Sequence, residues 1–334
     1  PNGGNRRIPT EAITGTNGKT TTAQMLSHCL QAVGDNVGMT TTNGIYINKH
    51  PIFEGDCAAA RAAHLLFKDP LIDIAVLETA RGGIINQGLA YEKCDVAAVL
   101  NISEDHLGKD NINNLEEMAA VKALVAQSAT QMLILNADDH LCRAMANTSH
   151  AKRICFISEE PENAFIKQHI NNNDCAIIVE NRSQNGDIVL YDKGQKIAAI
   201  PISSIPATLG GKALHNASNA AAALALAYGL NKPIKEVALA LTKFDCDFSS
   251  TPGRCNIYTG NDFTTLMDYA HNPEGMKALL KTADNIPNIN RRICVFKGSD
   301  SSSPEMIDQM CKIMTQRFDH YFIDFIDNHE EKHN

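Results

Sequence analysis

Short hydrophobic runs that end in polar residues recur along the first half of the chain. These runs lie at Ile72–Glu78, Val96–Asn101 and Met132–Asn136. Because they lack the alternation of a half-exposed strand, they predict strands of a parallel sheet that is covered by helices on both faces. Segments with helical periodicity fall between them, at Thr20–Val33, Asn114–Gln127 and Asp139–Ala146. This order predicts a doubly wound α/β fold, in which ligands bind beyond the carboxyl ends of the strands.

The pattern changes over residues 153–203. Short β-rich segments there alternate with turns such as Asn185-Gly186-Asp187 and Lys193-Gly194. We interpret this stretch as a small antiparallel β subdomain. Helical patterns then return at Asn216–Tyr228 and Pro233–Phe244.

A turn-rich segment, Ser249-Ser250-Thr251-Pro252-Gly253, predicts a boundary between a domain of residues 1–250 and one of residues 251–334. Beyond it we expect a hairpin around Gly260 and Asn261, followed by alternating helices and strands. The expected elements are a helix from Pro273, a strand at Arg292–Phe296, a helix at Pro304–Phe318 and a strand at Tyr321–Phe325. This order predicts a second, short, Rossmann-like α/β domain.

The segment TGTNGKTTT, residues 14–22, lies where a strand should run into a helix. Gly15 and Gly18 allow backbone N–H groups to close around phosphate oxygens, and Lys19 adds a positive charge at the helix N-terminus. Thr20 would offer its hydroxyl to Mg²⁺. The longer P-loop pattern has glycine where this chain has Ile13, so the match is to the shorter form. The segment predicts binding of ATP or GTP, and a chance Gly/Thr turn is the alternative.

Other candidates follow the predicted strands. Glu78 ends a buried run and precedes Gly82 and Gly83, so it is placed to hold the Mg²⁺ of a bound nucleotide; a solvent-facing charge is the alternative. His106 lies just beyond another strand. Lys122, on the next helix, would bind phosphate as a cation or, if a pocket lowers its pKa, be carbamylated and serve as a metal ligand; a surface lysine is the default.

Two candidates in the second half also have ordinary explanations. Asn219, in the segment HNASN that begins with His215, offers the donor and acceptor that match an adenine edge, or it caps the helix. Asp268 ends a predicted strand and is placed either to bind a ribose or to cap the next helix.

Composition limits the classes of function. The chain has 334 residues, of which 44% are hydrophobic, and a formal net charge of −8. It contains no long basic run, so we expect no nucleic-acid partner. The longest apolar stretch, Ala220–Leu230, is too short to span a bilayer, and we expect a soluble protein without a membrane partner. The ten cysteines are scattered without a CxxC pair, which is typical of reduced thiols in the cytoplasm.

Several motifs together resemble the Mur ligase superfamily. They are TGTNGKTTT, ETARGG, NISEDHLG, NADD, HNASNAAAALALA, TPGR and DYAHNPEG, and they appear in the family's order. Within the superfamily, GMTTTNGIYI and VLETARGGI are most similar to the Mur-ligase-like half of the cyanophycin synthetase family. The chain begins without Met and lacks the ATP-grasp half of that family, and its C-terminal domain is short. We therefore expect a piece of a longer protein or a reduced relative; a homo-oligomer is compatible with either.

The resemblance assigns roles to the candidates. It implies that the loop binds the phosphates of ATP, that Thr20 and Glu78 hold one Mg²⁺, and that His106 and Lys122 serve a second metal site. It further implies contacts of Asn219 with adenine, of Arg254 with phosphate and of Asp268 with ribose, with His271 on the closing domain. The phosphate-binding residues of the loop are Gly15, Thr16, Asn17, Gly18, Lys19, Thr20 and Thr21. The residues expected to face the acceptor are Thr42, Asn43 and Arg81.

The implied activity is an ATP-dependent amide ligase that works through an acyl phosphate. In the cyanophycin synthetase family, this half joins the α-amine of arginine to β-carboxyls of a polyaspartate backbone. Residues 55–61 and 297–303 depart from the family pattern, which leaves the acceptor open. The alternatives are a peptide or folylpolyglutamate ligase of the same superfamily, and a nucleotide-binding domain without turnover.

Overall fold

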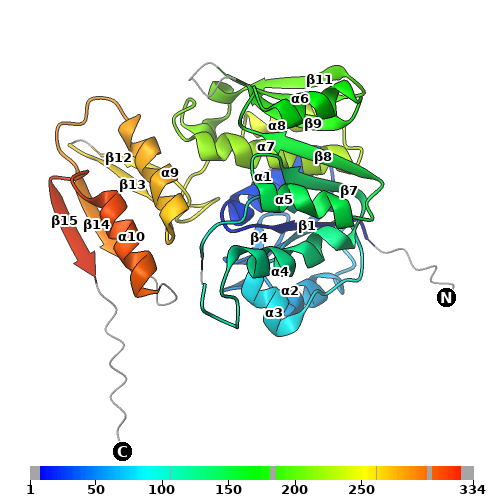
Figure 1. The fold of residues 1–334 in the computed structure, drawn as a ribbon, viewed down its shortest axis with the longest axis horizontal. Helices are drawn as coiled ribbons and strands as arrows, with labels where there is room; N and C mark the ends of the chain where they lie inside the picture. The colour runs from blue at the N-terminus through cyan, green and yellow to red at the C-terminus, as the bar shows by residue number, and fades with distance from the viewer. Residues whose placement is uncertain (1–7, 106, 181–185, 261, 299–302, 325–334) are drawn as a thin grey trace, which may run out of the picture.

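The computed structural model describes residues 8–105, 107–180, 186–260, 262–298 and 303–324. Within these ranges, an eleven-stranded sheet forms the centre of a large lobe, and a smaller C-terminal lobe follows it (Figure 1). The strands of the large sheet are β1 (Thr10–Thr14), β2 (Val37–Thr41), β3 (Gly44–Ile47), β4 (His50–Glu54), β5 (Ile74–Glu78), β6 (Cys94–Val99), β7 (Ala129–Asn136), β8 (Arg153–Ser158), β9 (Cys175–Glu180), β10 (Asp187–Asp192) and β11 (Gln195–Pro201).

The sheet has a parallel centre and antiparallel edges. Its order is β11-β10-β9-β8-β7-β6-β1-β5-β2-β3-β4. All strands from β9 to β2 in this order pair in parallel, whereas β10 and β11 at one edge and β3 and β4 at the other pair antiparallel. β1 lies between β5 and β6, so the chain passes to opposite sides of β1 as it builds the sheet. A crevice is expected at the carboxyl end of a strand in this position.

Helices cover both faces of this sheet. The helices of the large lobe are α1 (Lys19–Ala32), α2 (Ala60–Leu66), α3 (Arg81–Gln87), α4 (Leu115–Ser128), α5 (His140–Ala144), α6 (Ala164–Asn171), α7 (Leu214–Gly229) and α8 (Ile234–Leu241). Strand residues alternate between two cores: on β1, Ile13 packs with the core under α1, α7 and α8, whereas Ala12 packs with the core under α4. Burial on both faces explains why the parallel strands appear in the sequence as continuous hydrophobic runs.

The expected doubly wound, mostly parallel α/β fold is confirmed. The stretch of residues 153–203 contains the expected antiparallel pairs, β9 with β10 and β10 with β11. However, it begins with β8 and β9, which pair in parallel, and all of its strands continue the central sheet instead of forming a separate one. The hydrophobic pattern reports burial and strand length but not the partner of an edge strand, so this continuity was not visible in the sequence.

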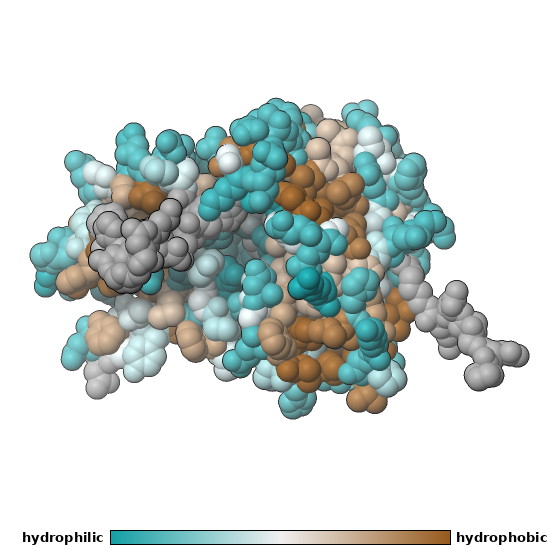
Figure 2. All heavy atoms as spheres, turned by 90° about the horizontal axis from the view of Figure 1, so that it is seen from below, coloured by the Kyte–Doolittle hydropathy of each residue, from teal (hydrophilic) through white to brown (hydrophobic). Residues whose placement is uncertain are grey.

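In its described residues, 251–260, 262–298 and 303–324, the C-terminal lobe contains two short sheets and two helices. Its elements are β12 (Asn256–Thr259), β13 (Thr264–Met267), α9 (Pro273–Asp284), β14 (Ile293–Lys297), α10 (Pro304–Met314) and β15 (His320–Asp324). The hairpin of β12 and β13 and the helix–strand order match the expectation, and β14 pairs with β15 in parallel. Figure 1 shows the lobe beside the large one, with α9 between α10 and the large lobe. From below, the surface is hollowed where the lobes meet (Figure 2).

The cysteines and the hydrophobicity of the helices also bear on expectations from the sequence. All ten cysteines are free thiols, and most of them are buried. Among the helices in the described ranges, none combines the length and the hydrophobicity needed to cross a membrane.

Glu11, in the middle of β1, is fully buried, and neither of its carboxylate oxygens has a hydrogen-bond partner in the part of the chain that the structure describes. Burial raises the pKa of Glu11 well above its usual range, and the nearby Asp35 and Asp95 add to this effect while Lys232 opposes it. The folded state therefore binds the Glu11 proton more tightly than the unfolded state, in which the pKa is about 4.3. The free energy of unfolding falls as the pH rises from this value through the raised pKa.

We expect Glu11→Gln to remove this pH dependence. The melting temperature of the variant relative to the parent should increase from about pH 5 to about pH 8. At the higher pH, only the parent must take up a proton on folding or bury a charged carboxylate, and either process lowers its stability. Thermal unfolding across this range measures the difference, with the exposed Glu92→Gln as the matched control. A constant difference between variant and parent would show that Glu11 keeps the same protonation state on unfolding.

Candidate active site

The loop between β1 and α1 is shaped by two glycines in unusual backbone conformations. Gly18, at the N-cap of α1, has a φ of 86°, and Gly15 has a φ of 155°. A Cβ on Gly18 would lie 2.3 Å from Oδ1 of Asn219, which comes from α7. A Cβ on Gly15 would lie 3.0 Å from Cβ of Leu100. The loop is therefore held so closely by its neighbours that position 18 accepts only glycine.

Asn101, directly after β6, holds the same loop from the other side. Its Oδ1 accepts hydrogen bonds from the backbone N–H groups of Thr16 (3.1 Å) and Asn17 (2.8 Å), and its Nδ2 donates to the carbonyl of Asn17 (3.1 Å). The N–H groups of Thr16 and Asn17 are thus already bonded. The amides of residues 18–21, at the N-terminus of α1, are left to bind an anion. We did not single out Asn101 from the sequence, although its place at a strand end was a signal for it.

Lys19, the first residue of α1, lies over the loop. Its Nζ donates to the carbonyl of Thr16 (2.8 Å). Burial lowers the pKa of Lys19, and Glu78 and Asp105 oppose this shift. Among the described residues, the hydrogen bond of Nζ goes to a backbone carbonyl, so this half-buried cation is well placed to bind a polyanion, which would replace the solvation that the amine has lost.

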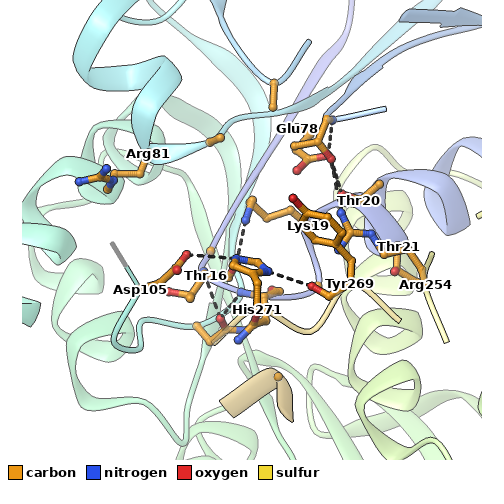
Figure 3. Close-up of a pocket in the computed structure, with 18 of the residues that line it drawn as sticks. Thr16, Lys19, Thr20, Thr21, Glu78, Arg81, Asp105, Arg254, Tyr269 and His271 are labelled. Carbon is orange, nitrogen blue, oxygen red and sulfur yellow. Dashed lines mark hydrogen bonds and ion pairs between the residues drawn. The ribbon is translucent and has the colours of Figure 1, made fainter. Parts of the chain in front are cut away.

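Thr20 and Glu78 meet beside the loop (Figure 3). The Thr20 hydroxyl donates to Oε2 of Glu78 (2.9 Å), and the same oxygen accepts from the backbone N–H of Thr42 (3.1 Å). The second oxygen, Oε1, is buried, and none of the described residues offers it a hydrogen bond. An ionised carboxylate with an unpartnered buried oxygen is costly unless a cation binds there.

This arrangement fits a magnesium ion. Mg²⁺ is commonly held by one or two carboxylates together with substrate phosphates, and Thr20 and Glu78 supply a hydroxyl and a carboxylate next to the phosphate-binding amides. Among the described residues, no group of three or more His, Cys, Asp and Glu side chains is arranged to hold a metal ion. A magnesium ion held by Thr20 and Glu78 would take its other ligands from substrate phosphates and water.

Lys122, in the middle of α4, is only 2% exposed. Burial, with a smaller contribution from the charge of Lys19, lowers its pKa to about 7. The low pKa removes the default interpretation of a surface lysine and meets the requirement for carbamylation that the sequence left open. His106, the other residue expected at a second metal site, lies outside the described residues.

The C-terminal lobe contributes to the same site. Arg254 donates from Nη2 to the hydroxyls of Thr20 (3.3 Å) and Thr42 (3.5 Å), and its guanidinium lies 5.1 Å from the centre of the Tyr269 ring. His271 pairs with Asp105 of the large lobe, at 3.6 Å between Nε2 and Oδ2. Figure 3 shows Arg254 and Tyr269 next to Lys19 and Thr20, and His271 between Tyr269 and Asp105.

Two of the expected nucleotide contacts already have partners within the protein. Asp268 accepts a hydrogen bond from the N–H of Cys255 (2.8 Å), and burial raises its pKa. Asn219 donates to Oδ1 of Asn216 (3.0 Å) and accepts from the hydroxyl of Thr22 (3.4 Å). The roles of Asp268 at ribose and of Asn219 at adenine stay predictions, and Asn219 in addition supports the glycine loop.

One cavity of about 880 Å³ joins these features. Every candidate that we named from the sequence lines it, with the exception of the undescribed His106; these residues are Gly15, Thr16, Asn17, Gly18, Lys19, Thr20, Thr21, Thr42, Asn43, Glu78, Arg81, Lys122, Asn219, Arg254, Asp268 and His271. Arg81 lies apart from the Thr20–Glu78 pair (Figure 3), where it contacts Asp110 at 2.8 Å and the carbonyl of Lys109 at 3.1 Å. The cavity therefore extends from the Thr20–Glu78 pair to Arg81, the first residue of α3.

The fold and the site define an α/β protein with a P-loop-like segment between β1 and α1, beside which a second lobe contributes Arg254 and His271 to the same cavity. Family models match both parts of the chain: the Mur ligase middle domain over residues 13–227, and the Mur ligase, glutamate ligase domain over residues 253–332. The chain belongs to the Mur ligase family.

Individual relatives agree with this assignment. Cyanophycin synthetase of Synechocystis sp. is 36% identical over 326 residues, which are 97% of this chain and 36% of that protein. A UDP-N-acetylmuramoyl-L-alanyl-D-glutamate--2,6-diaminopimelate ligase of Listeria monocytogenes is 28% identical and is matched over 91% of this chain and 61% of its own length. The chain thus spans about a third of the length of the cyanophycin synthetases that it matches.

Solved structures share the fold. MurF from Acinetobacter baumannii superposes with a TM-score of 0.68 at 17% identity, over 96% of this chain and 64% of that one. A bifunctional folylpolyglutamate synthase/dihydrofolate synthase, solved with Mn, AMPPNP and L-glutamate bound, gives 0.66 at 18% identity, over 94% and 74%.

We expect Gly18→Ala to weaken nucleotide binding by at least about tenfold, because the new Cβ forces Asn219 and the loop apart and the φ of 86° disfavours alanine. Calorimetric titration with ATP and Mg²⁺ measures this loss. Gly34→Ala is the matched control: Gly34 also has a positive φ, 98°, but nothing lies within 4 Å of its Cβ position. Equal effects of the two substitutions would show that the close contact with Asn219 is unimportant.

Proposed function

We propose that this chain is an ATP-dependent amide ligase that activates a carboxylate as an acyl phosphate and then joins it to an amine. The observation that carries the proposal is the convergence of Lys19, the Thr20–Glu78 pair and Arg254 on one side of a cavity that extends to Arg81. The same cavity thus offers groups that would bind phosphate and space for a second substrate. Membership of the Mur ligase family supports the same reaction class.

The chemistry requires these groups. A carboxylate resists attack by an amine because its carbonyl carbon shares the negative charge of the oxygens, and transfer of the terminal phosphoryl group removes this protection. Charge then develops on the phosphoryl oxygens, where Lys19, the amides of residues 18–21 and Arg254 stabilise it without any protein nucleophile. The half-buried position of Lys19 strengthens this interaction, since desolvation reduces the screening by water.

Thr20 and Glu78 would hold the magnesium ion of the nucleotide. When bound, the ion supplies positive charge that neutralises the phosphates. The protein contributes the orientation of the carboxylate: the hydroxyl of Thr20 and the N–H of Thr42 both fix Oε2 of Glu78, so that Oε1 is left for the cation.

For the substrates, we propose arginine as the amine and the β-carboxyl of a polyaspartate-type chain as the carboxylate. The support is the 36% identity with cyanophycin synthetases over nearly the whole chain. Thr42, Asn43 and Arg81 would face the acceptor. The second candidate is a peptide or folylpolyglutamate ligase with another acceptor, and the fold that the chain shares with a folylpolyglutamate synthase is compatible with it.

Phosphate release in the presence of ATP, Mg²⁺, an aspartate-rich peptide and single amino acids tests the proposal. We expect release to depend on both the peptide and arginine, and Lys19→Ala to lower kcat by about 10²–10³-fold through loss of transition-state stabilisation. Lys167→Ala, on the distant helix α6, is the control. Dependence on a different amino acid or acceptor would select the second candidate.

Tight ATP binding without release for any acceptor would contradict ligase activity of this chain and would leave a nucleotide-binding domain. Equal turnover of Lys19→Ala and the parent would remove the phosphate loop from the mechanism.

We further expect Lys122 to be carbamylated. With a pKa of about 7, about half of its amine is neutral at neutral pH, against less than about 0.1% for an ordinary lysine. Lowering the pH below 7 protonates the amine, so incorporation of ¹³C-labelled CO₂, detected by NMR, should fall toward about pH 6 and rise toward about pH 8. Lys122→Arg should lose the signal and activity together, and an unlabelled but fully active parent would contradict the expectation.

A further inference from the structure

We propose that Asn17 and Asn272 form an amide clasp that couples the phosphate loop to the C-terminal lobe, so that nucleotide binding and docking of the lobe stabilise each other. Both are positioning residues, since the clasp acts on the loop and not on the substrate. The inference rests on the proposed function, because it takes the loop to be the nucleotide site.

The clasp consists of two reciprocal hydrogen bonds. Nδ2 of Asn17 donates to Oδ1 of Asn272 (3.1 Å), and Nδ2 of Asn272 donates to Oδ1 of Asn17 (2.9 Å). The two residues are 255 positions apart and belong to different lobes. Asn272 is fully buried, so the loss of Asn17 leaves the Nδ2 group of Asn272 without this hydrogen bond.

On the C-terminal side, the clasp is part of a helix cap. The Oδ1 atom of Asn272 also accepts from the N–H of Gly275 (2.9 Å) and thereby caps α9. The first turn of α9, including Glu274 and Gly275, lines the same cavity as the loop. The position of α9 at the cavity is therefore tied to Asn17 by the same side chain that begins the helix.

On the side of the large lobe, the backbone of Asn17 is held in place. Asn101 fixes both its backbone N–H and its carbonyl, which leaves the amide of Asn17 as the part that faces the other lobe. Movement of the C-terminal lobe away from the loop must break both bonds of the clasp. Conversely, a nucleotide that orders the loop holds Asn17 ready for Asn272, and by linkage the two events favour each other by the same factor.

The clasp carries no charge, like the contact between Nδ2 of Asn285, at the C-cap of α9, and the carbonyl of Lys212 (3.4 Å). Arg254, in contrast, reaches the large lobe with a charged side chain, so phosphate and salt change its contacts. Two neutral amides have none of these dependences. Coupling through the clasp should therefore persist at high ionic strength, where charged contacts weaken.

Two variants break the clasp in different ways. Asn17→Ala removes it from the loop and leaves the cap of α9 intact. Asn272→Ser keeps a capping hydroxyl, since serine is a good N-cap, but is too short to reach Asn17. Asn163→Ala is the matched control, because Asn163 caps α6 through the N–H of Phe165 (3.0 Å) and lies elsewhere in the large lobe.

Hydrogen exchange by mass spectrometry, with and without ATP and Mg²⁺ at low and high salt, tests the coupling. In the parent, we expect ATP to protect both the loop and the first turn of α9. In both clasp variants, the protection of α9 should disappear and the affinity for ATP should fall by about 5–10-fold at either salt concentration. The control should match the parent.

The outcomes separate the two claims. If ATP protects the loop in a clasp variant and still protects α9 as in the parent, the coupling is wrong and the nucleotide site stands. If ATP protects neither segment in the parent, the nucleotide site fails, and the clasp loses its function with it. The hydrogen exchange of α9 in the absence of nucleotide is the reference for each variant. Exchange faster than in the parent would show that the substitution has unfolded the helix itself.

Discussion

The structure depends most on the close packing of the β1–α1 loop. Asn219 from one side and Asn101 from the other confine it, and only glycine fits at position 18. This packing orients the amides at the start of α1 toward the cavity and places Lys19 above the loop. Because β1 pairs with β5 on one side and β6 on the other, the carboxyl ends of all three strands lie together. Glu78 at the end of β5 and Asn101 after β6 therefore lie beside the loop.

Burial of charge is the second organising feature. Lys19, Glu78 and Lys122 are placed where water solvates them poorly, and the resulting cost appears as lowered lysine pKa values and an unpartnered carboxylate oxygen. A site of this kind is destabilising for the empty protein and attractive for a ligand that brings the opposite charges. A polyphosphate with its magnesium ion supplies both signs of charge. The contrast with Glu11, whose burial serves no contact with the cavity, shows that burial alone does not mark a functional residue.

Much of this was predictable, for identifiable reasons. Hydrophobic runs and strand-end polar residues are local signals, and they indicated the parallel sheet and the residues that line the cavity. Asn101 and Asn272 were not singled out, because their importance comes from contacts with residues 84 and 255 positions away. The continuation of the sheet through β10 and β11 was missed for a similar reason, since pairing partners depend on how edges meet. The surroundings that lower the pKa of Lys122 also come from several elements.

The central claim is that a phosphoryl group passes from ATP to a carboxyl oxygen. The most direct measurement uses an aspartate-rich peptide with ¹⁸O in its side-chain carboxylates, together with ATP, Mg²⁺ and arginine, and follows the isotope in the released phosphate by mass spectrometry. The account predicts that each phosphate released during coupling carries one ¹⁸O atom from the carboxylate. Amide formation with unlabelled phosphate would contradict it, because the carboxyl oxygen would then never have been bonded to phosphorus.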